Sequence, residues 1–336
     1  MLDRLVRFNW RAALRSRWLR LAGTVAGLAL LVHAVDVGRA AAVLAGIDPR
    51  WALLGVALTA ATVATGVAEW GLMLRAAAPH VGWRPLSLWY LQGLFVGQVT
   101  PSGGGYAVQV LAAGRVAGHR VVVAALAAGR MAGTLAMAAF GLGAAARLHA
   151  MVGRGVLAGS AIYVAFMLAC WPLAFGAHRL TAACRARSST ACHRLADHLE
   201  PFTGTFRLLR SRPGTVLGTF AVSALGWLLQ LMALRAFGQS VGVHAPWTVY
   251  AVSVPIALLA GVVPMSVGGI GLREGVLIGL LAHWGVDPGR AAALTVLMDL
   301  QRVPVALAGA LVFVRARHWA QPQRVPAHAV EVAAAA

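Results

Sequence analysis

Long apolar runs alternate with short arginine-bearing segments along most of the chain. A helix rises about 1.5 Å per residue, so about 20 apolar residues suffice to cross the roughly 30 Å of hydrocarbon in a bilayer. The pattern therefore predicts an all-α, polytopic membrane protein with six transmembrane helices. The six runs cover residues 18–38, 51–74, 121–146, 155–176, 214–237 and 292–314.

Two further apolar regions, 86–116 and 248–284, are interrupted near the middle by proline and glycine. Each arm has about 12 to 16 residues, which is enough to reach the bilayer midplane but not to cross the membrane. Proline ends a helix and glycine permits a tight reversal, so each region is predicted to be a hairpin of two helices. The breaking residues are Pro101, Gly103, Gly104 and Gly105 in the first region and Pro264, Gly268, Gly269 and Gly271 in the second.

The distribution of arginine predicts which segments face the cytoplasm. All 29 basic residues are arginine, and they gather in the first twenty residues, in the loop 177–213 and after residue 314. Cytoplasmic segments are enriched in basic residues, so both termini and this loop are expected inside. The uninterrupted spans already return the chain to that side each time. Both interrupted regions should therefore be re-entrant, with 86–116 entering from the cytoplasm and 248–284 from the outside.

This order of elements predicts an inverted repeat. Span, hairpin and span occur twice with opposite orientation, over 51–146 and 214–314, an arrangement that places transport sites near the bilayer midplane. The predicted organisation is a basic cytoplasmic segment (1–17), a single transmembrane domain (18–316) with a cytoplasmic amphipathic loop (177–213), and a cytoplasmic tail (317–336).

Composition agrees with a membrane location and narrows the partners. The 336 residues are 60% hydrophobic and carry a formal net charge of +19. Because the arginines lie between apolar segments, they indicate a juxtamembrane role rather than nucleic-acid binding. The richness in Ala, Gly and Arg without Lys favours a bacterial source, and no cleavage site follows the N-terminal arginines. We therefore expect a multi-pass protein of a bacterial inner membrane whose partners are membrane lipids. The sequence leaves open whether it forms a homo-oligomer.

Ionisable side chains at membrane depth are costly, so they mark candidate binding sites. Arg273 and Glu274 follow the second glycine break, where the N-terminus of a helix favours an anion. Glu274 could cap this terminus while Arg273 binds a phosphate, or the two side chains could simply pair with each other. The charged candidates are Glu69, Arg130, Arg235, Arg273, Glu274, Asp299 and Arg302, and the polar candidates Tyr106, Gln109 and Ser266 lie on the predicted hairpins.

The remaining charges suggest further pairs. Asp299 precedes Arg302 by three residues, so the two share a helix face and suit a neutralising pair. Glu69 could balance Arg130, or it could lie at the membrane interface. Arg235 lies near the end of its span, from where its side chain could reach the interface.

Enzymatic chemistry is not expected from this sequence. The histidines and cysteines between residues 178 and 198 lack the C-x-x-C spacing of a zinc site. The glycine clusters lack the lysine that follows the glycines of a P-loop. No nucleophile–base or metal–carboxylate motif is found, and the longest loop is too short for a catalytic domain. We therefore expect no enzymatic activity, no cofactor and no metal.

The segment 264–312 resembles the transmembrane region of lysylphosphatidylglycerol synthases, a family of flippase-like membrane proteins. The family pattern P-x-S-x-G-G-x-G-x-R-E is present in full, and the resemblance extends over about residues 15 to 316. The first family motif, P-G-x-x-G-(D/E)-x-x-R, is matched only in part, because Tyr106 replaces its acidic residue and Gln109 its arginine. The second pattern is formed by Pro264, Ser266, Gly268, Gly269, Gly271, Arg273 and Glu274, and Arg302 matches a later family arginine.

The resemblance implies that the protein moves lipids between leaflets. We expect an anionic phospholipid or related amphiphile to bind at a midplane site with Arg130, Arg273 and Arg302. Arg273 is the leading candidate, because the second hairpin retains the charged residues that the first has lost. Two alternatives remain: a transporter of small solutes or ions, and a non-transporting membrane subunit of a lipid or glycan pathway.

Overall fold

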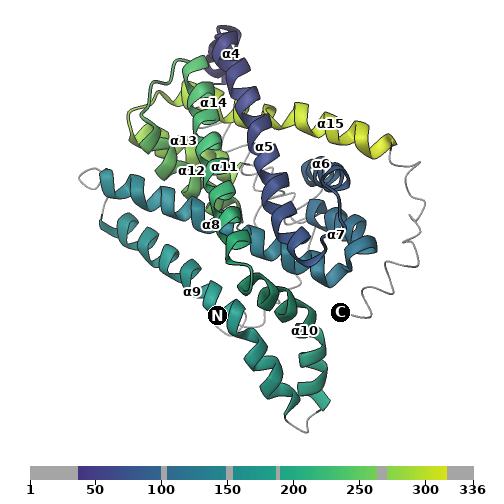
Figure 1. The fold of residues 1–336 in the computed structure, drawn as a ribbon. Helices are drawn as coiled ribbons and strands as arrows, with labels where there is room; N and C mark the ends of the chain where they lie inside the picture. The colour runs from purple at the N-terminus through teal and green to yellow at the C-terminus, as the bar shows by residue number, and fades with distance from the viewer. Residues whose placement is uncertain (1–36, 100–103, 149–153, 187–189, 263–270, 316–336) are drawn as a thin grey trace, which may run out of the picture.

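The computed structural model describes residues 37–99, 104–148, 154–186, 190–262 and 271–315, and within these ranges every regular element is a helix (Figure 1). In chain order the helices are α4 (Val37–Ala45), α5 (Pro49–Ala77), α6 (Trp83–Val99), α7 (Gly104–Ala117), α8 (His119–Arg147), α9 (Arg154–Arg185), α10 (Thr190–Arg210), α11 (Pro213–Ser240), α12 (Trp247–Val262), α13 (Leu272–His283), α14 (Pro288–Leu300) and α15 (Arg302–Arg315).

Four of the described helical runs are long and apolar enough to cross a membrane, which confirms the all-α, membrane-spanning class. They are Pro49–Ala77, His119–Arg147, Pro213–Ser240 and Pro288–Leu311, and each contains most of one predicted span. The predicted span 155–176 lies in the first part of α9. The predicted span 18–38 lies almost entirely outside the described residues.

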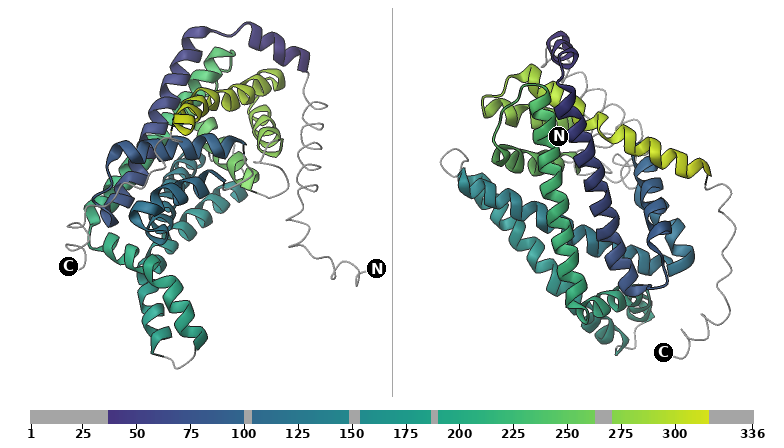
Figure 2. Two further views of the ribbon diagram at one scale, coloured as in Figure 1. Left: turned by 90° about the vertical axis from the view of Figure 1, so that its right-hand side faces the viewer. Right: turned by 45° about the horizontal axis from the view of Figure 1, so that its top comes forward.

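Helices α5 and α11 pack side by side along nearly their whole length (Figures 1 and 2). Gly55 faces the ring of Phe237, and Thr65 faces Gly226. Residue numbers rise along α5 as they fall along α11, so the two helices are antiparallel. A Cβ atom at Gly55 would lie 2.6 Å from the Phe237 ring, so the close approach requires glycine at this position.

Each interrupted region forms two helices that pack against each other, α6 with α7 and α12 with α13. A Cβ atom at Gly105 would lie 2.3 Å from the carbonyl oxygen of Gly93, so glycine lets α7 approach α6. Gly271 precedes α13 with a φ of +89°, a conformation that favours glycine. Gly104 is the first residue of α7. The other predicted breaking residues, Pro101, Gly103, Pro264, Gly268 and Gly269, lie outside the described residues.

The last predicted span differs from one straight helix. Helix α14 ends at Leu300 and α15 begins at Arg302 in another direction (Figure 1). Pro304 accounts for the change of direction, because it has no N–H for the carbonyl of Leu300 and its ring crowds that carbonyl. The side-chain amide of Gln301 donates a hydrogen bond to the carbonyl of Met298 at 2.9 Å, which compensates the end of α14.

The region 177–213 also differs from the short surface helices that an amphipathic loop would give. Helix α9 continues to Arg185, and α10 packs back against it, so the pair protrudes from one end of the molecule (Figures 1 and 2). The end of α10 is anchored by Phe206 and Leu209, which are fully buried. The ring of Phe206 lies 6.5 Å from that of Trp171 on α9. Apolar burial at its base therefore holds this extension against the bundle.

Candidate functional site

A cavity of about 550 Å³ lies where α5, α6, α7, α8, α11, α12 and the α14–α15 junction meet. It therefore draws residues from both halves of the chain. Small and apolar side chains form much of its wall, including Val63, Leu94, Met137, Trp227, Val254, Leu258, Met298 and Val305. Its polar residues are Thr59, Thr62, Thr65, Glu69, Tyr90, Tyr106, Gln109, Arg130, Thr134, Ser223, Gln230 and Gln301.

Glu69 lies on the cavity wall between α5, α8 and α11. Its Oε2 accepts a hydrogen bond of 2.7 Å from the Ser223 hydroxyl. The carboxylate also lies against Gly129 and Gly133, one helical turn apart on α8, where added Cβ atoms would be 3.4 and 3.3 Å from its oxygens. Two glycines thus make a shallow slot for a carboxylate in the middle of a membrane-spanning helix.

Arg130 lies between these two glycines in the sequence of α8, and its side chain is exposed to the cavity. The guanidinium carbon lies 5.2 Å from the centroid of the Tyr106 ring on α7, a cation–π arrangement. Arg130 also interacts electrostatically with Glu69 and with Tyr90 on α6. The cavity therefore presents one guanidinium beside one carboxylate, with aromatic rings around the guanidinium.

Gln109 lies one turn after Tyr106 on α7, with only 3% of its surface exposed. Its side chain fills the space beside Gly93, where a Cβ atom would lie 2.7 Å from its amide nitrogen. Its Oε1 accepts no hydrogen bond from any residue that the structure describes. A buried acceptor without a donor costs free energy, so this oxygen offers a position for a donor on a bound molecule.

A hydrogen bond between the two halves of the chain forms part of the cavity wall. The Thr59 hydroxyl on α5 donates a hydrogen bond of 2.6 Å to the side-chain oxygen of Gln301, at the junction of α14 and α15. Both side chains are buried. The bend that Pro304 produces thus places the polar side chain of Gln301 in the cavity wall. Without the bend, α14 would continue as a straight helix at this position.

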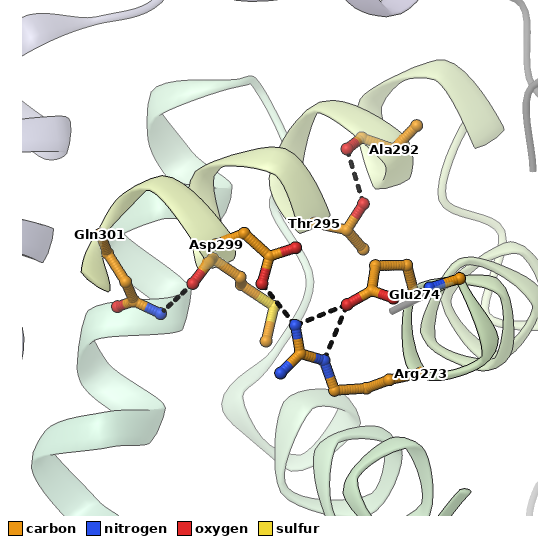
Figure 3. Close-up of polar contacts among 8 residues, drawn as sticks. Arg273, Glu274, Ala292, Thr295, Asp299 and Gln301 are labelled. Atoms are coloured by element: carbon orange, nitrogen blue, oxygen red, sulfur yellow. Dashed lines mark hydrogen bonds and ion pairs between the residues drawn. The ribbon is translucent and has the colours of Figure 1, made fainter. Parts of the chain in front are cut away.

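A second polar cluster surrounds Arg273 at the start of α13 (Figure 3). Arg273 Nε donates to Glu274 Oε1 at 2.8 Å, and its Nη2 bonds to both Glu274 and Asp299. Glu274 Oε2 accepts from the backbone N–H of Gly271 at 2.6 Å, which caps the helix. Arg273 and Glu274 are 8% and 7% exposed. This cluster satisfies its own charges and joins α13 to α14.

The family follows from comparison with known proteins. Residues 17–309 match the family model described as the lysylphosphatidylglycerol synthase TM region. The chain belongs to this family. It is also 25% identical over 297 residues to a "UPF0104 membrane protein" of Methanothermobacter thermautotrophicus, covering 82% of this chain and 88% of that protein. No solved structure matches the chain. Together with its apolar helices, the match identifies a multi-pass membrane protein.

In this member of the lysylphosphatidylglycerol synthase TM region family, the residues singled out from sequence fall into two groups. Glu69, Tyr106, Gln109 and Arg130 meet at the cavity. Arg273, Glu274 and Asp299 form the second cluster and are not among the described residues that line the cavity. Asp299 bonds to Arg273, and its expected pair with Arg302 involves a side chain that the structure does not describe. Ser266 and the side chain of Arg302 lie outside the described residues.

Several residues of the cavity were not among the site candidates from the sequence, because they are uncharged. Thr59, Thr62, Thr65 and Glu69 recur every three or four residues, which forms a polar stripe along one face of α5. That periodicity was a signal available in the sequence. Tyr90, Ser223, Gln230 and Gln301 are isolated polar residues in apolar helices, and only the packing of the family fold brings them together.

Proposed function

We propose that this family member moves an anionic phospholipid, or a related phosphate-bearing amphiphile, between the two leaflets of a membrane. The observation that carries the proposal is Arg130, whose guanidinium faces a cavity of about 550 Å³ within a bundle of apolar helices. Cavities of this size suit a small ligand or head group. A guanidinium binds phosphate through parallel N–H donors, while the acyl chains would remain in the bilayer.

We also propose that both hairpins are re-entrant. Helices α6 and α7 have 17 and 14 residues, and α12 and α13 have 16 and 12, fewer than the about 20 that a crossing helix needs. The Nε2 atom of His80, before α6, lies 3.4 Å from the carbonyl oxygen of Val116 near the end of α7. His244, before α12, and Trp284, after α13, line one groove. Hairpin ends that meet in this way support entry and exit on one face.

The contacts between the two halves support an inverted repeat. Gly309 on α15 approaches the carbonyl of Leu91 on α6, and Gly141 on α8 approaches that of Ala251 on α12. In each half, the last helix therefore contacts the first arm of the other half's hairpin. The antiparallel pair α5 and α11 would lie on the axis that relates the halves. Transporters built from inverted repeats bind their substrates between them, near the midplane.

The proposed setting is a bacterial inner membrane with both termini in the cytoplasm, on the strength of the arginine distribution. Helix α10 carries Arg207 and Arg210 in its last turn, next to the start of α11, and would lie on the same side. Membrane lipids would be the partners. Transport of this kind forms and breaks no covalent bond, so the proposal requires no enzymatic step, cofactor or metal.

The proposal is tested by measuring lipid movement in proteoliposomes. Arg130→Gln should slow the translocation of a head-group-labelled phospholipid by at least about tenfold, because a charge-assisted contact with phosphate is lost. Arg147→Gln is the matched control, since Arg147 ends the same helix, is exposed and lies outside the cavity. Equal rates in wild type and Arg130→Gln would refute the proposal. Release of an entrapped small solute without lipid movement would instead indicate a solute transporter.

A further inference from the structure

We propose that the head group bound in the cavity is zwitterionic, with one phosphate and one primary ammonium. This inference rests on the proposed lipid transport and narrows its substrate from an anionic phospholipid or related phosphate-bearing amphiphile to one whose head group also carries an ammonium. It comes from the position of Glu69 beside Arg130, together with the unpartnered side-chain oxygen of Gln109.

The cavity holds both a basic and an acidic side chain before any ligand enters. Among the described residues that line it, Arg130 and Glu69 are the arginine and the carboxylate, and they interact electrostatically. A ligand that brings only a phosphate would take over Arg130 and leave the Glu69 carboxylate facing a like charge. Removing one partner of a charge pair in a poorly hydrated site is strongly unfavourable. A ligand with both charges replaces each partner and leaves neither one unmatched.

The hydrogen-bonding capacity of the cavity also calls for a donor on the ligand. Gln109 Oε1 is buried and accepts no hydrogen bond from the described part of the chain. Glu69 offers further acceptor capacity, because a carboxylate accepts about four hydrogen bonds and Ser223 supplies one. A primary ammonium has three N–H donors and no acceptor. It therefore matches a carboxylate and an amide oxygen better than a hydroxyl does.

The positions proposed for the phosphate and for the ammonium are close enough for one small head group. Gly129 and Gly133, which hold the Glu69 carboxylate, flank Arg130 within one turn of α8, about 5.4 Å along the axis. On the facing side, Tyr106 and Gln109 lie one turn apart on α7. A phosphate at Arg130 and an ammonium near Glu69 and Gln109 would thus be separated by a short linker, such as the two carbons of ethanolamine.

Head-group preference in proteoliposomes tests this inference. Labelled phosphatidylethanolamine should be translocated about tenfold or more faster than phosphatidylglycerol, which has the phosphate but no ammonium. Phosphatidylcholine should be slower than phosphatidylethanolamine, because its quaternary ammonium has no N–H for Gln109. Glu69→Gln should slow phosphatidylethanolamine and remove its advantage over phosphatidylglycerol. Glu200→Gln, at an exposed ion pair with Arg185 outside the cavity, is the control and should keep the preference.

The possible outcomes separate the inference from the function on which it rests. Faster movement of phosphatidylglycerol than of phosphatidylethanolamine would overturn the zwitterionic site and leave lipid transport intact. Failure of the wild type to move any of these lipids would overturn the proposed function itself. If Glu69→Gln does not fold, native mass spectrometry of the wild type in mixed micelles decides. Retention of phosphatidylethanolamine over phosphatidylglycerol supports the inference, and the reverse order contradicts it.

Discussion

Arg273 and Arg130 both lie in apolar helices, but their surroundings differ. Arg273 is buried between Glu274 and Asp299, whose carboxylates accept from its Nε and Nη2. Arg130 faces a cavity, where its guanidinium carbon lies 5.2 Å from the centroid of the Tyr106 ring and it interacts electrostatically with Glu69. Sequence reasoning could not separate the two, because both are charged residues near a predicted hairpin. It ranked Arg273 first, whereas the geometry favours Arg130 as the residue that meets a ligand.

Arg273 is expected to stabilise the fold. Arg273→Gln should lower the free energy of unfolding by about 2 to 3 kcal/mol, because the buried Glu274 carboxylate would lose its ion pair and the partly exposed Asp299 would lose one of its contacts. Combining it with Glu274→Gln and Asp299→Asn should restore most of that loss, since both carboxylates are removed together with the guanidinium that they bind and glutamine can still cap Gly271. Thermal unfolding in detergent measures both. An unchanged midpoint in the single variant, or no recovery in the triple variant, would contradict a structural role.

At the scale of elements, apolar length and proline–glycine breaks predicted most helices, and α5, α8 and α11 lie where expected. Two departures have physical causes beyond hydropathy. The last span bends because Pro304 removes a hydrogen bond within an otherwise apolar run. Helix α10 packs on α9 because Phe206 and Leu209 find a buried surface beside Trp171. Such a surface exists only once the helices have assembled, so an amphipathic segment alone could not reveal it.

If both hairpins are re-entrant, as proposed, the two ends of each hairpin face the same side of the membrane. In a variant with its native cysteines replaced, His80→Cys and His119→Cys should both react with an impermeant maleimide from the cytoplasmic side only. His244→Cys and His283→Cys should both react from the opposite side only. These four histidines flank the hairpins and are exposed. If a hairpin crosses the membrane, the two positions at its ends will instead be labelled from opposite sides.

At the scale of the whole molecule, the cavity depends on contacts that no local pattern contains. Its wall combines the polar stripe of α5 with residues of seven other helices, brought together by the close packing of glycine-lined helices. The sequence supplied Glu69, Arg130, Tyr106 and Gln109 as separate candidates. It could not place them in one site, because their distances depend on how the two halves of the chain pack together.

If lipid passes through this cavity, filling the cavity with a larger side chain should block lipid movement. Thr62 lines it, whereas Ala64, two residues away on α5, is exposed on another face of the helix. Thr62→Trp and Ala64→Trp should both fold, and each should be reconstituted with a labelled phospholipid. Thr62→Trp should reduce lipid translocation by at least about tenfold, since the indole would occupy the cavity. Ala64→Trp should keep the wild-type rate. Wild-type translocation in folded Thr62→Trp would contradict the passage of lipid through the cavity.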